Sequence, residues 1–100
     1  MTPLPLAFLD AARAEFDEAV DWYEDQKECL GAEFVAQVDE VFGLIAVLPK
    51  VHPIVYRDVR RAVVKKFPYV VHYLVEDQRL LIVSVFHTSR DPSIWKARVP

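Results

Sequence analysis

The chain has 100 residues, of which 53% are hydrophobic and 27% are charged, and its formal net charge is −3. This length and this apolar content suit a single folded domain spanning residues 1–100, and they exclude a disordered chain, which could not bury enough apolar surface. The acidic balance argues against a general nucleic-acid binder, so we expect no sequence-specific DNA binding by this chain alone.

The cysteine content and the N-terminal residues bear on location and cofactors. Cys29 is the only cysteine, so neither an intrachain disulfide nor a cysteine metal cluster can form, which fits the reducing cytoplasm. The N-terminus lacks the positive region of a signal peptide, and no stretch approaches the roughly 20 apolar residues of a membrane span. We therefore expect a cytoplasmic protein with no membrane association, no metal and no other cofactor.

The N-terminal quarter predicts a strand followed by a helix. Residues 4–9 are apolar but contain a proline and follow another, which places this strand at a sheet edge. Asp10 is expected to cap the helix that follows, residues 11–26, by accepting a bond from a first-turn amide. The apolar stripe of this helix consists of Ala12, Phe16, Ala19 and Tyr23, widened by Trp22.

Acidic residues occupy the remaining faces of this first helix. They could form a metal or acid/base site, but no histidine stands at ligand spacing, so a solvated helix face is the favoured interpretation. These acids are Glu15, Asp17, Glu18, Asp21, Glu24 and Asp25.

A second helix is predicted for residues 32–48, where Pro49 ends it. Gly43 weakens this helix by about 1 kcal/mol relative to alanine, which indicates a close approach to a neighbouring element. The short link at Gly31 makes the two helices an antiparallel hairpin. The second apolar stripe consists of Phe34, Val38, Val41 or Phe42, Ile45 and Leu48.

Residues 50–56 are expected to form a connector, and residues 57–65 a strand that carries apolar and basic residues on both parities. Two interpretations of its long basic side chains remain open. They reach an anionic or acidic partner, or they protect a sheet edge against the addition of another strand.

Two apolar runs, residues 69–75 and 80–86, predict the final strands, and the polar residues 76–79 between them have hairpin length. Val70, Leu74, Ile82 and Phe86 share one parity, and Val71, Val75, Val83 and Val85 share the other. We predict an α+β two-layer domain of order β-α-α-β-β-β, with the helix hairpin packed on one face of an antiparallel sheet. The other face is expected to be apolar and exposed, which marks a binding partner.

The last strand delivers five functional candidates to one edge of the sheet: His87, Arg90, Trp95, Lys96 and Arg98. His87 could act as a general acid or base, and the arginines, with Arg60 or Arg61, could hold a phosphate during RNA cleavage. Residue types alone favour a structural alternative, in which His87 bonds a neighbouring backbone group and the arginines pair with acids such as Asp91.

Two further aromatic side chains are also interpreted as structural. Trp95 could stack on a base, but packing against the sheet edge is favoured. His72 lies in mid-strand among apolar residues and is interpreted as a satisfied core or partner-face histidine rather than a catalyst.

A series of motifs spans nearly the whole chain. The C-terminal half contains Phe67-Pro68-Tyr69, Val71 and Tyr73, followed by His87-x-x-Arg90-x-Pro92-x-x-Trp95-x-x-Arg98. The N-terminal half contains Ala12-x-x-Glu15-Phe16-x-x-Ala19-x-x-Trp22-Tyr23-Glu24, Leu30-Gly31-x-x-Phe34 and Ile45-x-x-x-Pro49. Each motif is weak alone, but together, in this order and spacing, they resemble the RelE/ParE-type toxins of bacterial type II toxin–antitoxin systems, the plasmid stabilisation protein family.

The resemblance implies a growth-inhibiting toxin that forms a hetero-oligomer with a cognate antitoxin protein. The motifs look more like the ParE branch, whose members inhibit DNA gyrase by binding it. The resemblance also implies that contacts to the target or antitoxin come from Trp95, Lys96, Arg98, Arg60 and Tyr73.

Two alternatives remain open. RelE-like members cleave mRNA on the ribosome, and for such an enzyme the resemblance implies catalytic candidates at His87, Arg90, Arg60, Arg61 and Lys65. A diverged, inactive member would act only as an antitoxin-binding module.

Overall fold

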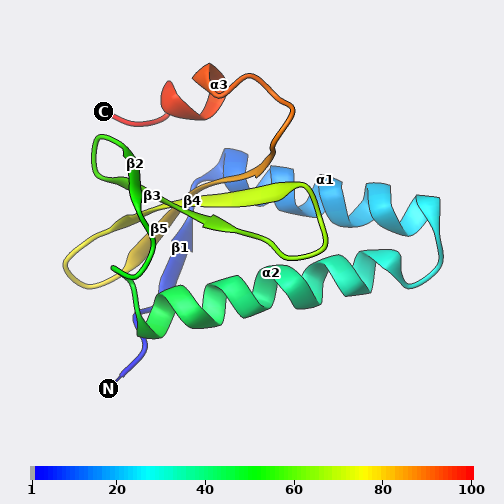
Figure 1. Cartoon of the computed structure of the whole chain (residues 1–100), viewed down its shortest axis with the longest axis horizontal. Coiled ribbons are helices and arrows are strands. Elements are labelled where there is room, and N and C mark those ends of the chain that lie inside the picture. The colour runs from blue at the N-terminus through cyan, green and yellow to red at the C-terminus, as the bar shows by residue number, and fades with distance from the viewer. Residues whose placement is uncertain (1) are drawn as a thin grey trace.

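The structure is a computed structural model that describes residues 2–100. Figure 1 shows two long antiparallel helices on one side of a twisted sheet and a short C-terminal helix on the other. In chain order the elements are β1 (Leu6–Phe8), α1 (Asp10–Gln26), α2 (Leu30–Val47), β2 (Ile54–Tyr56), β3 (Val59–Val63), β4 (Tyr69–Val75), β5 (Leu80–His87) and α3 (Ser93–Lys96). The predicted α+β fold with a helix hairpin on one sheet face is confirmed.

The sheet within residues 2–100 has five strands in the order β1-β5-β4-β3-β2. Strands β3, β4 and β5 form the predicted antiparallel meander. Strand β1 lies at the predicted edge, but it runs parallel to β5, with Leu6 opposite Leu80, so the sheet is mixed. Pro5 keeps a role in this ladder because its carbonyl accepts a bond of 2.9 Å from the amide of Leu80, although its nitrogen cannot donate.

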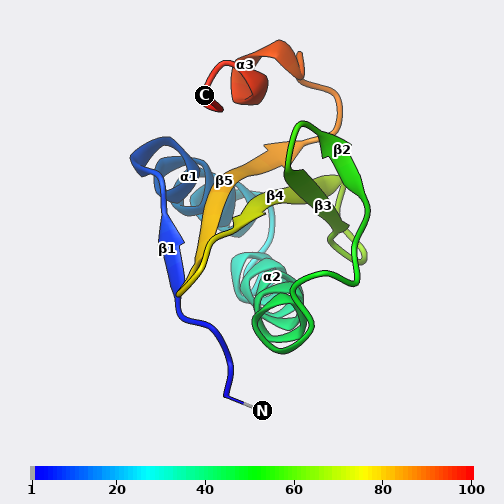
Figure 2. The ribbon, with the colours of Figure 1, turned by 90° about the vertical axis from the view of Figure 1, so that its left-hand side faces the viewer.

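Strand β2 is an edge strand within the region that we expected to be a connector. It pairs with the start of β3 through a tight turn in which Arg57 has a φ of 51°. The strand has three residues, and Pro53 precedes it, so the apolar signal is too short to distinguish it from a loop. The β2–β3 hairpin extends the sheet on the side away from β1 (Figure 2).

The main core lies between the sheet and the helix hairpin. Phe34, Val38 and Ile45 of α2 are fully buried there, and Ala12 and Ala19 let α1 approach β5 closely. Aromatic rings fill the far end, where Tyr23 and Phe34 pack against Phe67 and Tyr69 with centroids 4.8–6.0 Å apart. The predicted stripes of both helices therefore face this core.

Several details of the helices differ from expectation. The link between them is residues 27–29, because α2 begins at Leu30 and includes Gly31. Leu9, not Asp10, is the N-cap of α1, and no side chain caps that end. Trp22 and Leu48 are 56% and 47% exposed, so the buried stripes are narrower than predicted. A Cβ at Gly43 would meet nothing within 4 Å, whereas at Gly31 it would lie 2.8 Å from the carbonyl oxygen of Val20. The close helix–helix approach is therefore at Gly31.

The opposite face of the sheet is covered, and our prediction of an exposed apolar face is wrong. The C-terminal tail, defined here as residues 88–100, folds back over it and places α3 on the side opposite α2 (Figure 2). Trp95 is 4% exposed, and it anchors a second apolar cluster on this face. The buried members of that cluster are Val59, Val70, Val83, Phe86 and Trp95.

A β-bulge in β5 changes which side chains reach each face. His72 lies opposite Ser84 and Tyr73 opposite Ile82, so Val83 is the extra residue. As a result Ile82 joins the core under the helices and Val83 joins the tail cluster, which reverses the faces that strict alternation predicts. No helix within residues 2–100 is long and apolar enough to cross a membrane.

Candidate functional site

The C-terminal tail is tied to the start of α1 by one carboxylate. Glu15 Oε2 accepts from Arg90 Nη1 at 2.9 Å and Arg98 Nη2 at 2.8 Å, and Oε1 accepts from Arg98 Nη1 at 2.9 Å. Glu15 Oε1 also accepts from the amide of Val85 at 3.2 Å. We call Glu15, Arg90 and Arg98 the Glu15 cluster. The predicted structural role of the arginines has the right chemistry but the wrong partner, because Asp91 instead bonds the amide of Ser93.

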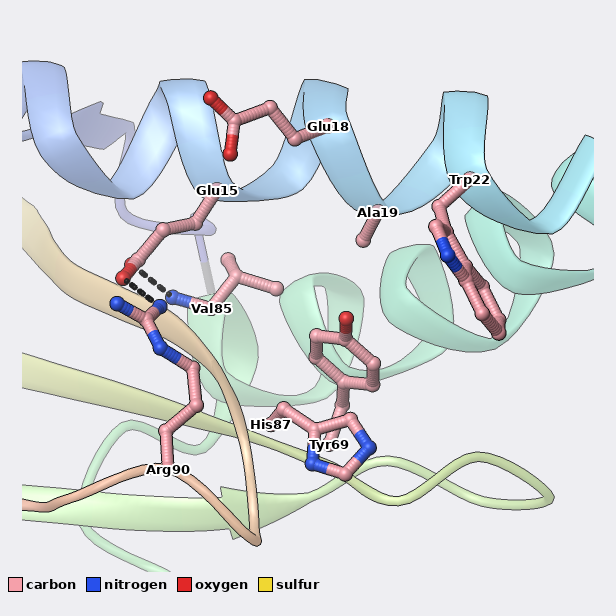
Figure 3. Close-up of a pocket in the computed structure, with 8 residues that line it drawn as sticks. All are labelled: Glu15, Glu18, Ala19, Trp22, Tyr69, Val85, His87 and Arg90. Carbon is pink, nitrogen blue, oxygen red and sulfur yellow. Dashed lines mark hydrogen bonds and ion pairs between the residues drawn. The ribbon is translucent and has the colours of Figure 1, made fainter.

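Beside this cluster lies a cavity of about 280 Å³, which we call the α1 cavity. Figure 3 shows Glu15 and Trp22 reaching it from α1, and Tyr69, His87 and Arg90 from the sheet side. Burial raises the pKa of Tyr69, and the nearby Tyr23 adds to that effect, so the phenol stays protonated near neutral pH. The cavity thus combines aromatic walls with two carboxylates, of which Glu15 is paired with arginines and Glu18 forms no ion pair within residues 2–100.

His87 makes a local bond, as the structural interpretation predicted. Its Nδ1 accepts from the backbone amide of Ser89 at 3.0 Å, and the hydroxyl of Ser89 lies 2.8 Å from the same atom. A backbone amide can only donate, so Nδ1 is an acceptor and Nε2 is the ring nitrogen that bears a proton. The ring also packs edge-on against Tyr69 with centroids 5.2 Å apart. His87 is therefore oriented by its own turn.

A second cavity, of about 270 Å³, lies between the sheet and the tail, and we call it the tail cavity. His72 is 2% exposed at this cavity, and its ring stacks on Trp95 with centroids 3.8 Å apart and an interplanar angle of 18°. Its Nδ1 lies 2.6 Å from Ser84 Oγ, which the bulge places opposite it. The prediction of a buried, satisfied histidine is confirmed for this nitrogen, and Trp95 packs rather than offering a free face.

The charge around His72 is strongly positive. Burial is the main cause that lowers its pKa to about 4, and the nearby cations Arg61, Arg98 and Lys96 lower it further. His72 is therefore neutral at pH 7, and the tail cavity holds cationic side chains beside an uncharged ring.

The other candidates lie elsewhere. Arg60 Nη1 donates to the carbonyls of Lys50 and His52, at 3.2 and 2.7 Å, and the hydroxyl of Tyr73 donates to Pro49 O at 2.8 Å. Tyr73 is fully buried. Lys65 lines a separate groove beside α2. The α1 cavity brings together His87 and Arg90. The tail cavity brings together Arg61, Arg90, Trp95 and Lys96. Neither cavity is lined by Arg60, Tyr73 or Lys65.

Sequence reasoning missed the role of Glu15, and it predicted the burial of His72 but not the side chains that surround it. Glu15 was assigned to a solvated face, yet it stands three residues after Ala12 and four before Ala19, within the buried stripe, and that position was the available signal. The position of His72 over Ser84 and Trp95 depends on the bulge and the tail, which no local pattern reveals. Among residues 2–100 no three His, Cys, Asp or Glu side chains are grouped to hold a metal ion.

Comparison with known proteins supports the motif reading. Among solved structures, the chromosomal ParDE toxin–antitoxin system from P. aeruginosa has a similar chain, with a TM-score of 0.74 and 16% identity over 86% of this chain and 97% of that one. At this identity the similarity shows the fold. Comparison with curated proteins gives no match. The family model described as the ParE toxin of the type II toxin–antitoxin system parDE matches residues 6–92, and the chain therefore belongs to the ParE toxin family.

Proposed function

We propose that this chain acts by binding DNA gyrase and inhibiting it, that it performs no catalysis, and that a cognate antitoxin protein neutralises it. The family membership carries the toxin–antitoxin context. The Glu15 cluster is the observation that favours binding over RNA cleavage, because it occupies two of the cations that a nuclease reading requires.

Among the other nuclease candidates, His87, Arg60 and Lys65 strengthen this view, whereas Arg61 lies apart from His87, in the tail cavity. A general acid or base must come within hydrogen-bond reach of the group that it serves, together with a cation that stabilises developing charge. Within residues 2–100 the one cation that lines the cavity of His87 is Arg90, and it is already paired with Glu15. Arg60 donates to two backbone carbonyls, and Lys65 lines another groove. Their arrangement supports structural roles for these side chains.

We place the target contact on the exposed residues of α3, within the tail. Trp95 is buried and Arg98 is held by Glu15, so both contribute by fixing the position of α3. Ile94 is 41% exposed, and Lys96 has its ammonium 5.2 Å from the ring of Tyr56 with no carboxylate partner within residues 2–100. Ile94 and Lys96 are therefore the proposed contacts of α3 with the target.

The test combines purified gyrase with cells that express the chain without its antitoxin. We expect loss of gyrase supercoiling, growth arrest with a DNA-damage response, and no new 5′ ends within translated messages. The His87→Ala variant should retain inhibition, because its ring is bonded to its own turn. New cuts in messages that disappear in His87→Ala would replace this proposal with the endoribonuclease, and a folded chain that leaves growth unaffected would replace it with the antitoxin-binding module.

A further inference from the structure

The tail cavity has the composition of an anion site. Its lining includes the cations Arg61, Arg90 and Lys96 and contains no carboxylate. Glu15 already holds Arg90, but within residues 2–100 neither Arg61 nor Lys96 has an ion-pair partner. Asp91 attracts Lys96 from outside the cavity lining without forming an ion pair with it. Cations that share a concave site without a carboxylate in its walls repel each other, and a bound anion removes that repulsion.

His72 lines this cavity with a buried ring whose position is fixed. His72 is 2% exposed. Its Nδ1 is hydrogen-bonded to the hydroxyl of Ser84, and one face of its ring stacks on Trp95. No hydrogen bond to its second ring nitrogen, Nε2, occurs within residues 2–100, although the ring lines the cavity. When Ser84 donates to Nδ1, the neutral ring carries its proton on Nε2 and offers a donor to a guest. Thr88 also lines the cavity.

The walls favour a carboxylate on an alkyl stem over a nucleic-acid phosphate. Val55, Val70 and Phe86 line the cavity and suit the methylene groups of an acidic side chain. Trp95 is buried by its stack on His72, so it offers no platform for a base, on which single-stranded nucleic-acid binding depends. The net charge of −3 also disfavours a long polyanion but not one buried carboxylate.

We infer that the tail cavity binds the carboxylate of a glutamate or aspartate side chain, supplied by an acidic segment of the cognate antitoxin. The carboxylate would pair with Arg61 and Lys96 and accept from His72 Nε2. This inference deepens the proposed function and rests on its antitoxin partnership. An acidic segment seated there would also cover Lys96, a proposed target contact, so neutralisation would follow from occupation of one surface.

Glutarate, which carries a carboxylate on a glutamate-like stem, is the probe for the cavity. The intact chain, labelled with ¹⁵N, is titrated while the imidazole signals of His72 and the indole N–H signal of Trp95 are followed by NMR. We expect a saturable shift of both signals with half-saturation at millimolar glutarate. Arg61→Gln and Lys96→Gln should each weaken binding about tenfold, as expected for the loss of one charge-assisted bond.

Lys27→Gln is the matched control, because it removes one positive charge from an exposed position outside the cavity. It should leave the titration unchanged, and well-dispersed spectra of all variants establish that they fold. The cavity assignment is overturned by the absence of a shift, by a shift that Arg61→Gln leaves intact, or by tighter binding of a short oligothymidylate than of glutarate. Inorganic phosphate serves as the comparison for a simple oxyanion, and tighter binding of phosphate would overturn the choice of carboxylate.

The source of the carboxylate is tested with the toxin–antitoxin complex purified after co-expression. In the complex, glutarate should no longer shift the His72 signals, because the antitoxin occupies the cavity. A shift as large as that of the free chain would show that the antitoxin does not occupy this cavity. Gyrase inhibition is read in a separate assay, so the failure of that proposal and the failure of this one are distinguishable.

Discussion

The side chain of Glu15 joins three segments of the chain, because it accepts from two arginines of the tail and from an amide of β5. Its side chain is 10% exposed and that of Arg98 is 16% exposed. Replacement by glutamine leaves both guanidinium groups without their charge partner, so we expect Glu15→Gln to lower the free energy of unfolding by about 2–3 kcal/mol. Urea unfolding measures this loss. Glu18→Gln, one turn away and exposed, is the control and should change stability by less than about 0.5 kcal/mol, and equal effects of the two would contradict the role of the cluster.

His72 makes stability depend on pH. Its pKa is about 4 in the folded chain, because burial and neighbouring cations disfavour the charged ring, and the unfolded value is 6.5. Below pH 6.5 the unfolded chain binds a proton at this histidine, whereas the folded chain binds it only near pH 4. The contribution of His72 to the free energy of unfolding is therefore fully present above pH 6.5, and about 3 kcal/mol is lost as the pH falls to about 4. Urea midpoints from pH 7.5 to 5 should fall less steeply in His72→Gln than in the unaltered chain. The same slope in both would show that His72 does not contribute.

At the scale of elements, the two glycines of α2 have opposite roles. Gly31 donates its amide to Glu24 Oε1 at 3.0 Å and lets the start of α2 approach α1, where a Cβ would lie 2.8 Å from the backbone oxygen of Val20. Gly43 faces open space. We expect Gly43→Ala to raise the unfolding free energy by about 0.5–1 kcal/mol, since alanine restricts the unfolded chain, and Gly31→Ala to lower it by about 1–3 kcal/mol through the steric conflict. Chemical denaturation of the two variants checks this, and stabilisation by Gly31→Ala would show that the helices can separate without loss.

At the scale of the whole molecule, the tail completes a second apolar layer. Deletion of residues 93–100 should expose the cluster around Val70, Val83 and Phe86, which Trp95 covers. We expect the shortened chain to unfold at lower urea and to bind the dye anilinonaphthalene sulfonate, which reports exposed apolar surface. Ile94→Ser in the full chain is the control, because Ile94 is 41% exposed and its loss should change neither measurement. A shortened chain that binds no dye would mean that the sheet face is closed by other residues.

Local patterns predicted most of the architecture and little of the site. The period of the apolar residues in α1 and α2, and the two Val-rich runs of β4 and β5, carry their information within a short window, so the layer order followed from them. The bulge at Val83 and the return of the tail depend on contacts between distant residues, and they reversed the expected exposure of one sheet face. Arg90 and Arg98 were correctly read as ion-pair residues, but their partner Glu15 is 75 and 83 positions away in the sequence.

The pairing of β1 with β5 affects how the chain folds during translation, because the two strands are synthesised at different times. Leu6 has its ladder partner at Leu80, and Glu15 finds its arginines only at Arg90 and Arg98, so the first strand and first helix are made long before the segments that hold them. Contacts of this sequence separation slow folding, because a long loop must close before any of them forms. On the ribosome, the helix hairpin can assemble early, while the sheet and its tail must wait for the last residues described here. A nascent chain therefore cannot complete the β1–β5 ladder or the Glu15 cluster until β5 and the C-terminal tail have been synthesised.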